Sequence, residues 1–257
     1  MRSYTALIRT CNSERFLPET LQALEAQTVP PAAYVFVDSG SSDRTPDLLP
    51  SNGRLHRYRG GRFNYSDALN QGLALVETDH VLIVSSHTAL NHPGAMAFAL
   101  DLVDRDEGAG AAYFTSESAD ALAASFVHAE SFTGFNGVWN TCGLIRMDLL
   151  RRRSFRSEVF SAEDQEWSRW LVETERRPIA SVAGARVGFN NPGKHVPEKR
   201  LNEYWAVALY VRPEMLRALY LMRVFYRIVR PVSAWKERFF NARLLFGLMR
   251  CRLVGHP

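Results

Sequence analysis

The sequence predicts an α/β fold: a mostly parallel central sheet flanked by helices and followed by a helical C-terminal extension. Two observations lead to this fold class. Short apolar runs of the kind that form buried strands alternate with segments whose apolar residues recur at helical spacing. Strands that alternate with helices form mostly parallel sheets with helices on their faces. After about residue 203 only helical spacing continues.

The first half of the chain is expected to supply four strands and three helices. The runs at residues 34–37 and 81–84 are apolar at every position, as in strands buried on both faces. Polar residues such as Asn12 or Ser13 suit the start of the first helix. In chain order we expect a strand at 4–8, a helix at 13–27, a strand at 34–37, a short helix at 45–49, a strand at 55–58, a helix at 65–76 and a strand at 81–84.

The second half continues with a looser alternation. We expect a helix at 93–104, strands at 111–114 and 138–145, helices at 147–152 and 162–175, and a strand at 179–189. The polar and turn-forming residues 190–193 end this last strand pattern. The sequence therefore predicts a sheet domain over residues 1–200 and a helical extension over residues 201–257.

Basic residues are concentrated near the C-terminus. The formal net charge is +4, yet residues 212–252 hold ten Arg and Lys against two Glu. Apolar and aromatic side chains recur between the basic ones, which is typical of helices on an anionic membrane surface. Residues 204–255 are therefore expected to contact such a surface, to pack on the sheet domain, or to form a homo-oligomer interface. Nucleic acid is disfavoured because the segment is too apolar for a solvated phosphate track.

The cysteines and the N-terminus indicate a cytoplasmic protein, or one that is peripheral on the inner face of a membrane. Cys11, Cys142 and Cys251 are odd in number and widely spaced, which argues against a disulfide framework or a Cys-x-x-Cys metal site. The N-terminus lacks a signal-peptide pattern, and no window approaches the roughly 18 to 20 apolar residues that cross a bilayer.

Polar sets follow three of the expected strands, at residues 9–12, 38–41 and 85–87. Ligands of open α/β sheets bind at the carboxyl ends of strands, so these loops should converge on one crevice. Asp38 beside a glycine turn can accept hydrogen bonds from a ribose or a base edge, while nearby hydroxyls and amides satisfy phosphate oxygens. The alternative is that the loop is only a strand-ending turn.

Three motifs resemble the inverting glycosyltransferases of family 2, which have the GT-A fold, over residues 4–190. They read Ile-Arg-Thr-Cys-Asn at 8–12, Val-Asp-Ser-Gly-Ser-Ser-Asp-Arg-Thr at 37–45 and Phe-Asn-Tyr-Ser-Asp-Ala-Leu-Asn-Gln-Gly at 63–72. The resemblance implies a nucleoside-diphosphate sugar as donor. It implies donor contacts from Arg9, Thr10, Asn12, Asp38, Ser39, Asp67, Asn70, Ser85 and His87.

Ser85-Ser86-His87 stands where the family has an Asp-x-Asp motif that holds a divalent cation. A Ser-x-His sequence there resembles the rhamnosyltransferase-like branch of the family. Metal use stays open: His87 either ligates a divalent ion such as Mg²⁺ or Mn²⁺, or donates a hydrogen bond to the leaving phosphate without metal. The third interpretation is that Ser85-Ser86-His87 is only the polar end of a strand. Lys194 and His195 are further candidates to cover the diphosphate.

Glu-Asp-Gln-Glu-Trp at 163–167 is similar to the family's Glu-Asp-x-x-Trp helix start, whose aspartate is the catalytic base. The resemblance assigns the base to Asp164, oriented by Glu163. Direct displacement at an anomeric carbon needs such a carboxylate to accept the proton of the acceptor hydroxyl. The alternative is that both acids only stabilise a helix N-terminus. Asn140, Arg146 and Trp167 are the expected acceptor-side residues.

The sequence thus predicts an inverting hexosyl or deoxyhexosyl transferase. Its acceptor is expected to be a saccharide or a lipid-linked saccharide, in the assembly of cell-surface polysaccharide or lipopolysaccharide. Two alternatives keep the same fold. One is a catalytically inactive binding or scaffolding subunit, in which the missing Asp-x-Asp motif marks lost catalysis. The other is a glycosyltransferase that acts on nucleic acid recruited by the basic extension.

Overall fold

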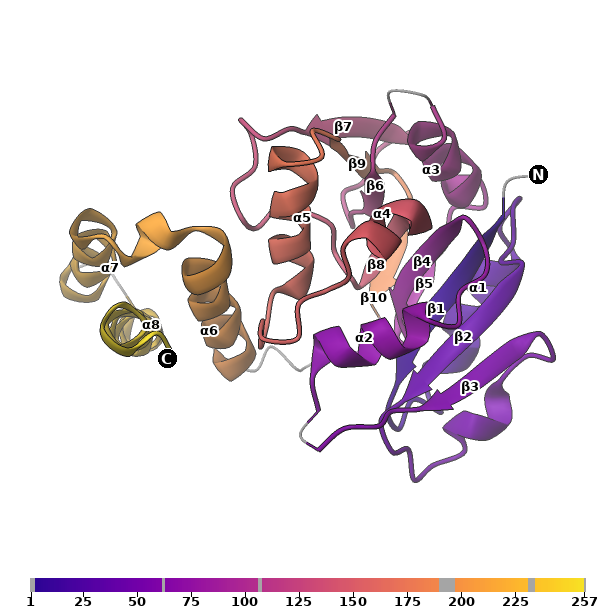
Figure 1. Cartoon of the computed structure of the whole chain (residues 1–257), viewed down its shortest axis with the longest axis horizontal. Coiled ribbons are helices and arrows are strands. Elements are labelled where there is room, and N and C mark those ends of the chain that lie inside the picture. Colours follow the sequence, from indigo (N-terminus) through magenta and orange to yellow (C-terminus); the bar gives the residue numbers. More distant parts are fainter. Residues whose placement is uncertain (1–2, 62, 106–107, 190–196, 231–233, 257) are drawn as a thin grey trace.

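The computed structural model describes residues 3–61, 63–105, 108–189, 197–230 and 234–256. Its centre is an eight-stranded sheet with the strand order β3-β2-β1-β4-β8-β6-β9-β7 (Figure 1). The strands are β1 (Tyr4–Thr10), β2 (Ala33–Asp38), β3 (Gly53–Arg57), β4 (His80–Ser85), β6 (Ala111–Phe114), β7 (Ala123–Val127), β8 (Cys142–Arg146) and β9 (Ile179–Ala183). A small antiparallel pair, β5 (Thr88–Leu90) and β10 (Val187–Phe189), stands beside it.

Helices cover both faces of the sheet and form the C-terminal extension. They are α1 (Leu17–Glu25), α2 (Tyr65–Leu73), α3 (Ala95–Val103), α4 (Met147–Arg152), α5 (Glu163–Glu173), α6 (Pro197–Ala206), α7 (Ala218–Val229) and α8 (Trp235–Val254). Short turns of other helix types lie at η1 (Thr45–Leu48), η2 (Val207–Val211) and η3 (Pro213–Leu216). The predicted α/β class with flanking helices and a helical extension is confirmed.

Strands β3, β2, β1 and β4 are all parallel to one another, and β6 is parallel to β9. The pairs formed by β8 and by β7 are antiparallel. Four of the seven neighbouring pairs are therefore parallel, as the alternation of strands and helices predicts. The parallel block carries the polar loops singled out in the sequence.

The two faces of the sheet bury separate cores. Successive residues of β1 alternate between them: Leu7 belongs to the core under α2 and α5, whereas Ala6 and Ile8 belong to the core under α1 and α3. Gly72 lets α2 approach the sheet closely, because a Cβ there would lie 2.4 Å from Leu7 Cδ1 and 2.7 Å from Val37 Cγ2. The helix that carries Asp67 and Asn70 is thus held against β1 and β2.

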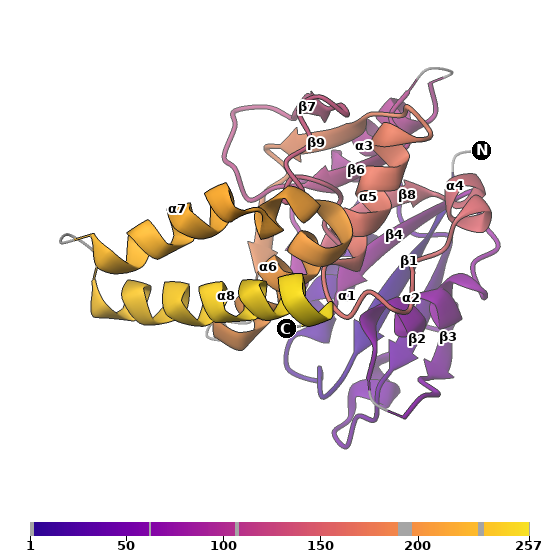
Figure 2. The same cartoon turned by 60° about the vertical axis from the view of Figure 1, so that its left-hand side comes forward.

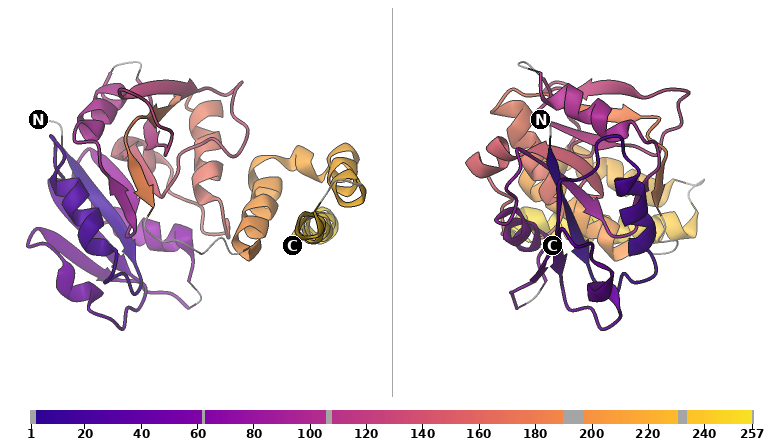
Figure 3. Two further views of the ribbon diagram at one scale, coloured as in Figure 1. Left: turned by 180° about the vertical axis from the view of Figure 1, so that it is seen from behind. Right: turned by 90° about the vertical axis from the view of Figure 1, so that its right-hand side faces the viewer.

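The extension shares a core with the sheet domain. Leu201, Val207 and Leu248 are buried in the same apolar cluster as Leu7 and Ile145. The expected boundary after residue 200 falls inside α6, so this helix belongs to both parts. Helices α7 and α8 run side by side as a hairpin that projects away from the sheet (Figures 1 and 2), and the view from behind shows the same separation (Figure 3). None of the helices in the described residues combines the length and apolar character needed to cross a bilayer.

One expected strand is divided in the structure, and two short strands are present that the sequence pattern does not predict. The expected strand at 179–189 is divided into β9 and β10, because Gly184 adopts a left-handed φ of +78° and turns the chain. The short strands β5 and β7 are not predicted by the sequence pattern. Exposed residues dominate β7, which lies at the edge of the sheet and therefore lacks a strong apolar signal.

Candidate active site

The carboxyl ends of β1, β2 and β4 lie side by side in the sheet. The register pairs Thr10 with Asp38 and Arg9 with Ser85. Because these strands are parallel, the loops that follow them open on one edge of the sheet. The structure therefore brings together four residues expected to bind the donor, namely Arg9, Thr10, Asp38 and Ser85.

Asp38 is buried and its carboxylate is occupied by its own loop. Oδ1 accepts hydrogen bonds from the backbone N–H groups of Gly40 and Ser41, at 3.0 and 2.9 Å. Oδ2 accepts from Thr10 Oγ1 at 2.9 Å and from Ser41 Oγ at 2.5 Å. Burial by itself would raise the pKa of Asp38, but these hydrogen bonds outweigh it and lower the pKa. These four bonds occupy both carboxylate oxygens, so Asp38 fixes the shape of its loop.

Asn12 and Ser39 join the first two loops. Asn12 has a left-handed φ of 48°, and its Oδ1 accepts a hydrogen bond from Ser42 N at 2.8 Å. Asn12 N donates to Ser41 Oγ at 2.9 Å, and Ser39 N donates to Thr10 O at 3.0 Å. These two expected donor-binding residues therefore connect the loop after β1 to the loop after β2.

Asp67 and Asn70 bind the loop that precedes α5. Asn70 Nδ2 donates to Phe155 O at 2.7 Å, and Phe155 N donates back to Asn70 Oδ1 at 3.2 Å. Asp67 accepts a hydrogen bond from Ser157 Oγ. Both side chains tie α2 to the segment that leads into α5.

Ser85, Ser86 and His87 offer few metal ligands. Ser86 Oγ is hydrogen-bonded to Ser13 Oγ at 2.7 Å, and Ser85 N donates to Thr141 O. The pKa of His87 is lowered by burial and then by the positive charges of Lys199 and Arg9. A divalent ion placed here would meet two cations, one imidazole and hydroxyl groups, and this donor set does not fit an Mg²⁺ or Mn²⁺ cage. No group of three His, Cys, Asp or Glu that could hold a metal occurs among the described residues.

A pocket of about 330 Å³ opens between the sheet edge, α5 and α6. Its lining includes four predicted site residues: Arg9, Asn140, Glu163 and Asp164. The remaining lining residues are Tyr65, Phe135, Trp139, Thr141, Ser161, Ala162, Gln165, Phe189, Lys199, Glu203 and Val207. The pocket therefore unites the end of β1, the loop before β8, the start of α5 and the first helix of the extension.

The start of α5 places two carboxylates beside Asn140. Asn140 N donates to Asp164 Oδ2 at 3.3 Å, and Asn140 Nδ2 donates to Glu163 Oε1 at 3.2 Å. Gln165 N donates to Asp164 Oδ1 at 2.8 Å. Ala162 precedes them with a left-handed φ of 58°, a strained conformation for alanine that is typical of functional sites. The turn directs Glu163 and Asp164 to the same pocket.

Asp164 has the properties of a general base. Burial raises its pKa to about 7, and the neighbouring Glu163 adds to the increase, while the hydrogen bonds from Asn140 and Gln165 oppose it. Glu203 of α6 makes a smaller contribution in the same direction. A carboxylate with a pKa near neutrality accepts a proton much more readily than an ordinary one.

Two buried polar atoms at this pocket lack partners. Within the described residues, Arg9 Nη1 and Asn140 Oδ1 make no hydrogen bond. The Arg9 guanidinium lies over the Tyr65 ring, 4.7 Å from its centroid. An unsatisfied buried guanidinium nitrogen favours an anion, and an unsatisfied carbonyl oxygen favours a hydroxyl. The pocket is therefore suited to a ligand that carries both negative charge and hydroxyl groups.

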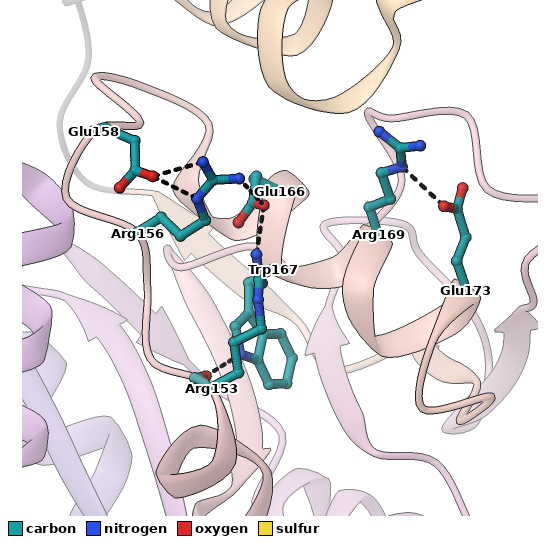
Figure 4. Close-up of polar contacts among 7 residues, drawn as sticks. All are labelled: Arg153, Arg156, Glu158, Glu166, Trp167, Arg169 and Glu173. Carbon is teal, nitrogen blue, oxygen red and sulfur yellow. Dashed lines mark hydrogen bonds and ion pairs between the residues drawn. The ribbon is translucent and has the colours of Figure 1, made fainter.

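Trp167 lies in the core and not at the pocket, which corrects its expected acceptor-side role. Its side chain is 0% exposed, and Nε1 donates to Arg153 O at 2.8 Å (Figure 4). The preceding residue, Glu166, pairs with Arg153 at 2.6 Å and with Arg156 at 3.3 Å. These contacts anchor α5 on the loop that α2 braces, so they hold Asp164 in place indirectly.

Arg146 is also placed away from the site. It pairs in register with His80 at the amino end of β4, and its guanidinium binds Asp148 at 3.0 Å. Since β8 is antiparallel to β4, its last residue lies at the edge of the sheet opposite the pocket. The expectations for Lys194 and His195 concern residues outside the described part of the chain.

Lys199 and Glu203 are site residues that the sequence reasoning missed. They are four residues apart on α6, so they share one helix face, and their Nζ and Oε1 atoms lie 3.9 Å apart. Burial raises the pKa of Glu203, while Lys199 opposes the increase. The spacing is visible in the sequence, but nothing in the sequence shows that α6 folds back over the pocket.

Comparisons with known proteins agree with this arrangement. The model of glycosyl transferase family 2 matches residues 5–116. That range contains the parallel block of β1, β2, β3 and β4, the polar loops and helix α2. No curated protein sequence matches the chain significantly.

Solved structures show the same fold at low sequence identity. TarS 1–349 of S. aureus in complex with UDP-GlcNAc aligns with a TM-score of 0.64 and 17% identity, over 96% of this chain and 81% of that chain. The longer TarS structure aligns over 95% of this chain, which spans 43% of the TarS chain, with a TM-score of 0.60 and 17% identity.

Two further structures were solved with Mn²⁺. The mannosyltransferase PcManGT of Pyrobaculum calidifontis, with GDP-Man and Mn²⁺, has a TM-score of 0.64 and 14% identity, over 99% of this chain and 88% of that chain. Glucosyl-3-phosphoglycerate synthase of Mycobacterium tuberculosis, with Mn²⁺ and UDP, has a TM-score of 0.58 and 15% identity, over 80% of this chain and 76% of that chain. Residues 5–116 thus carry the sequence pattern of glycosyl transferase family 2, and the chain as a whole has the GT-A fold of these transferases.

Proposed function

We propose that the protein transfers a sugar from a nucleoside-diphosphate sugar to an acceptor hydroxyl, with inversion at the anomeric carbon. The observation that carries this proposal is the pocket in which Asp164, with a pKa near 7, lies beside two unsatisfied polar atoms of Arg9 and Asn140. The family 2 match over residues 5–116 and the nucleotide sugars held by the structural neighbours support the same donor class.

In the proposed reaction the acceptor oxygen attacks the anomeric carbon from the face opposite the nucleotide. Asp164 removes the proton of the acceptor hydroxyl as the new C–O bond forms and the bond to the diphosphate oxygen breaks. One displacement inverts the configuration. Glu163 is a positioning residue: it holds Asn140 and raises the proton affinity of Asp164.

The negative charge of the diphosphate is compensated by Arg9 and Lys199, with His87 next to them. Arg9 and Lys199 line the pocket, and both lower the pKa of His87. Two cations in a partly enclosed cleft can offset a diphosphate as a metal does, because charge-assisted hydrogen bonds are strong there. We expect donor binding and transfer to persist in EDTA, with no gain from Mg²⁺ or Mn²⁺.

Replacement of Lys199 tests this compensation. Lys199→Ala should weaken donor binding about tenfold or more, whereas the exposed Arg54→Ala should not change it. Titration of the donor in EDTA, with and without Mn²⁺, measures both effects. Strict dependence on Mn²⁺ would reject the metal-free site, and equal affinity of the two variants would reject the role of Lys199.

The acceptor is proposed to be a saccharide or lipid-linked saccharide used in cell-surface polysaccharide or lipopolysaccharide assembly, on the cytoplasmic face of the membrane. The support is the hairpin of α7 and α8, which exposes apolar side chains such as Leu219, Phe225 and Phe246 among basic residues. Such a surface suits an anionic membrane or a second copy of the chain. The sugar is proposed to be a hexose or deoxyhexose, as in the rhamnosyltransferase-like branch.

A thermal-shift panel of UDP-, GDP-, dTDP- and CMP-sugars tests the donor class first. A donor that binds the folded state raises its stability, so one nucleotide class should raise the melting temperature. Slow donor hydrolysis, abolished in Asp164→Asn, would distinguish an enzyme from a binding subunit. Absence of both binding and hydrolysis across the panel would favour the non-catalytic alternative.

A further inference from the structure

A second cavity, of about 600 Å³, lies in the extension between α6, α7 and α8. Its walls are aromatic and aliphatic as well as basic. The lining residues are Pro197, Arg200, Tyr204, Arg227, Trp235, Lys236, Glu237, Phe239, Phe240, Asn241, Arg243 and Leu244. Four basic residues and one acid line the cavity. The acid, Glu237, is paired with Arg230 at 2.8 Å, and one of the basic residues, Arg243, is paired with Glu198 at 2.9 Å.

The aromatic and basic groups of this cavity are stacked on one another. The Arg200 guanidinium lies 5.1 Å from the centroid of the Phe240 ring, and the Arg243 guanidinium lies 5.9 Å from that of Phe239. Trp235 is 72% exposed and Phe239 is 60% exposed, although both line the cavity. Exposure of large apolar rings beside cations favours a ligand with both an apolar part and negative charge.

Helix α6 separates this cavity from the candidate active site. Lys199 and Glu203 line the catalytic pocket, whereas Arg200 and Tyr204, each one residue further along, line the second cavity. The Tyr204 ring also lies 5.0 Å from the ring of Phe135, which lines the catalytic pocket. One helix thus supplies a wall to both cavities.

We propose that the second cavity binds one anionic lipid, with the phosphate-bearing head at the basic residues and the hydrocarbon chain along Trp235, Phe239 and Leu244. Its volume is within the range of small-molecule sites. The apolar walls argue against nucleic acid, whose contacts are mainly ionic. The basic lining argues against a neutral lipid. This inference goes beyond the proposed function, and its test does not depend on sugar transfer.

Calorimetric titration with dihexanoyl phosphatidic acid, kept below its micelle concentration, tests the site without a membrane surface. We expect saturable binding of one molecule per chain, and weaker binding of inorganic phosphate and of zwitterionic dihexanoyl phosphatidylcholine. Lys236→Glu should weaken binding about tenfold or more, because an attractive charge becomes repulsive. Trp235→Ala should weaken it through loss of apolar contact.

Matched controls change the same chemistry outside the cavity. Arg223→Glu makes the same charge change on α7, and Phe246→Ala removes an exposed ring of α8; neither residue lines the cavity. Both variants should bind the lipid as the parent protein does. Equal losses in all four variants would indicate diffuse adsorption and overturn the proposal, as would the absence of saturable binding. A dimer that dissociates in Trp235→Ala, detected by light scattering, would assign the cavity to a second copy instead.

Discussion

At the scale of single residues, the candidate site depends on how burial and neighbours change the proton affinity of Asp164. In water, the carboxyl group of an aspartate ionises at a pH well below 7. In the pocket, burial and the adjacent Glu163 raise its pKa to about 7, although two backbone N–H groups favour the ionised form. The same environment that makes ionised Asp164 costly makes it an effective base. Stability and activity therefore respond to this residue in opposite directions.

Asp164→Asn is expected to reduce transfer by about 10²–10⁴-fold, because the amide cannot accept the acceptor proton. Donor affinity should change little. Asp148→Asn, which alters an exposed carboxylate paired with Arg146 at the far edge of the sheet, is the matched control and should transfer normally. Steady-state rates with the donor found in the thermal-shift panel provide the measurement. Transfer within threefold of the parent rate would remove Asp164 from the role of base.

The same variant should also change stability with pH. The pKa of Asp164 is raised in the folded state, so its stabilising contribution is present below the unfolded pKa and is lost as the pH rises through about 7. The Asp164→Asn variant has no carboxyl group at this position, so it should not lose stability in this way as the pH rises. We expect the variant to have a higher melting temperature than the parent at pH 8, with a smaller difference at pH 5. A lower melting temperature at pH 8 would contradict the raised pKa.

Glu163→Gln should move the pH dependence of transfer. The electrostatic effect of Glu163 is the second cause of the raised Asp164 pKa, so replacement of Glu163 by neutral Gln should lower that pKa. The rising limb of kcat/KM, which we expect near pH 7 in the parent, should shift to lower pH. Glu173→Gln, on the exposed end of the same helix, is the control and should leave the limb in place. If the rising limb does not move in Glu163→Gln, the limb reports the ionisation of a group other than Asp164.

At the scale of elements, the position of α5 is set by contacts that lie far from the pocket. Gly72 allows helix α2 to lie close to the sheet. The Asn70 side chain of α2 donates a hydrogen bond to Phe155 O and accepts one from Phe155 N. The segment after Phe155 leads to the strained Ala162 and then to Glu163 and Asp164. Trp167 and Glu166 fix the other side of α5 to Arg153. Helix α2 therefore helps to hold the segment that leads into α5.

Asn70→Ala should lower the free energy of unfolding by about 1–3 kcal/mol, because two buried backbone groups of Phe155 lose their partner. The melting temperature should fall by several degrees. Transfer should fall through a lower kcat, since α5 is less well positioned. Gln22→Ala replaces an exposed helical amide of α1 and serves as the control. Unchanged stability in Asn70→Ala would mean that water replaces the lost bonds.

At the scale of the whole molecule, the extension and the sheet domain share one apolar core. Leu248 of α8 is 0% exposed in a core that also contains Ile145 and Trp167 of the sheet domain. Helix α6 lines both the catalytic pocket and the second cavity.

Leu248→Ala should destabilise the protein by about 2–5 kcal/mol, because it leaves a cavity in this shared core. Calorimetry should still show one unfolding transition for the sheet and the extension together. Leu253→Ala, at a position that is 78% exposed, should change stability by less than about 0.5 kcal/mol. Two separate transitions, with only the minor one shifted, would show instead that the extension is an independent domain.

The sequence by itself determined the α/β class, the parallel strands and the loops that follow them, because apolar runs and turn residues act locally. It also indicated Asp164 and Glu163, whose motif is contiguous. Only the tertiary structure decided that Asp38, Asp67 and Asn70 brace loops, that Trp167 is in the core, and that Arg146 lies at the far edge. It also brought Lys199 and Glu203 to the pocket. These outcomes depend on strand direction and on contacts between distant segments, which local patterns do not encode.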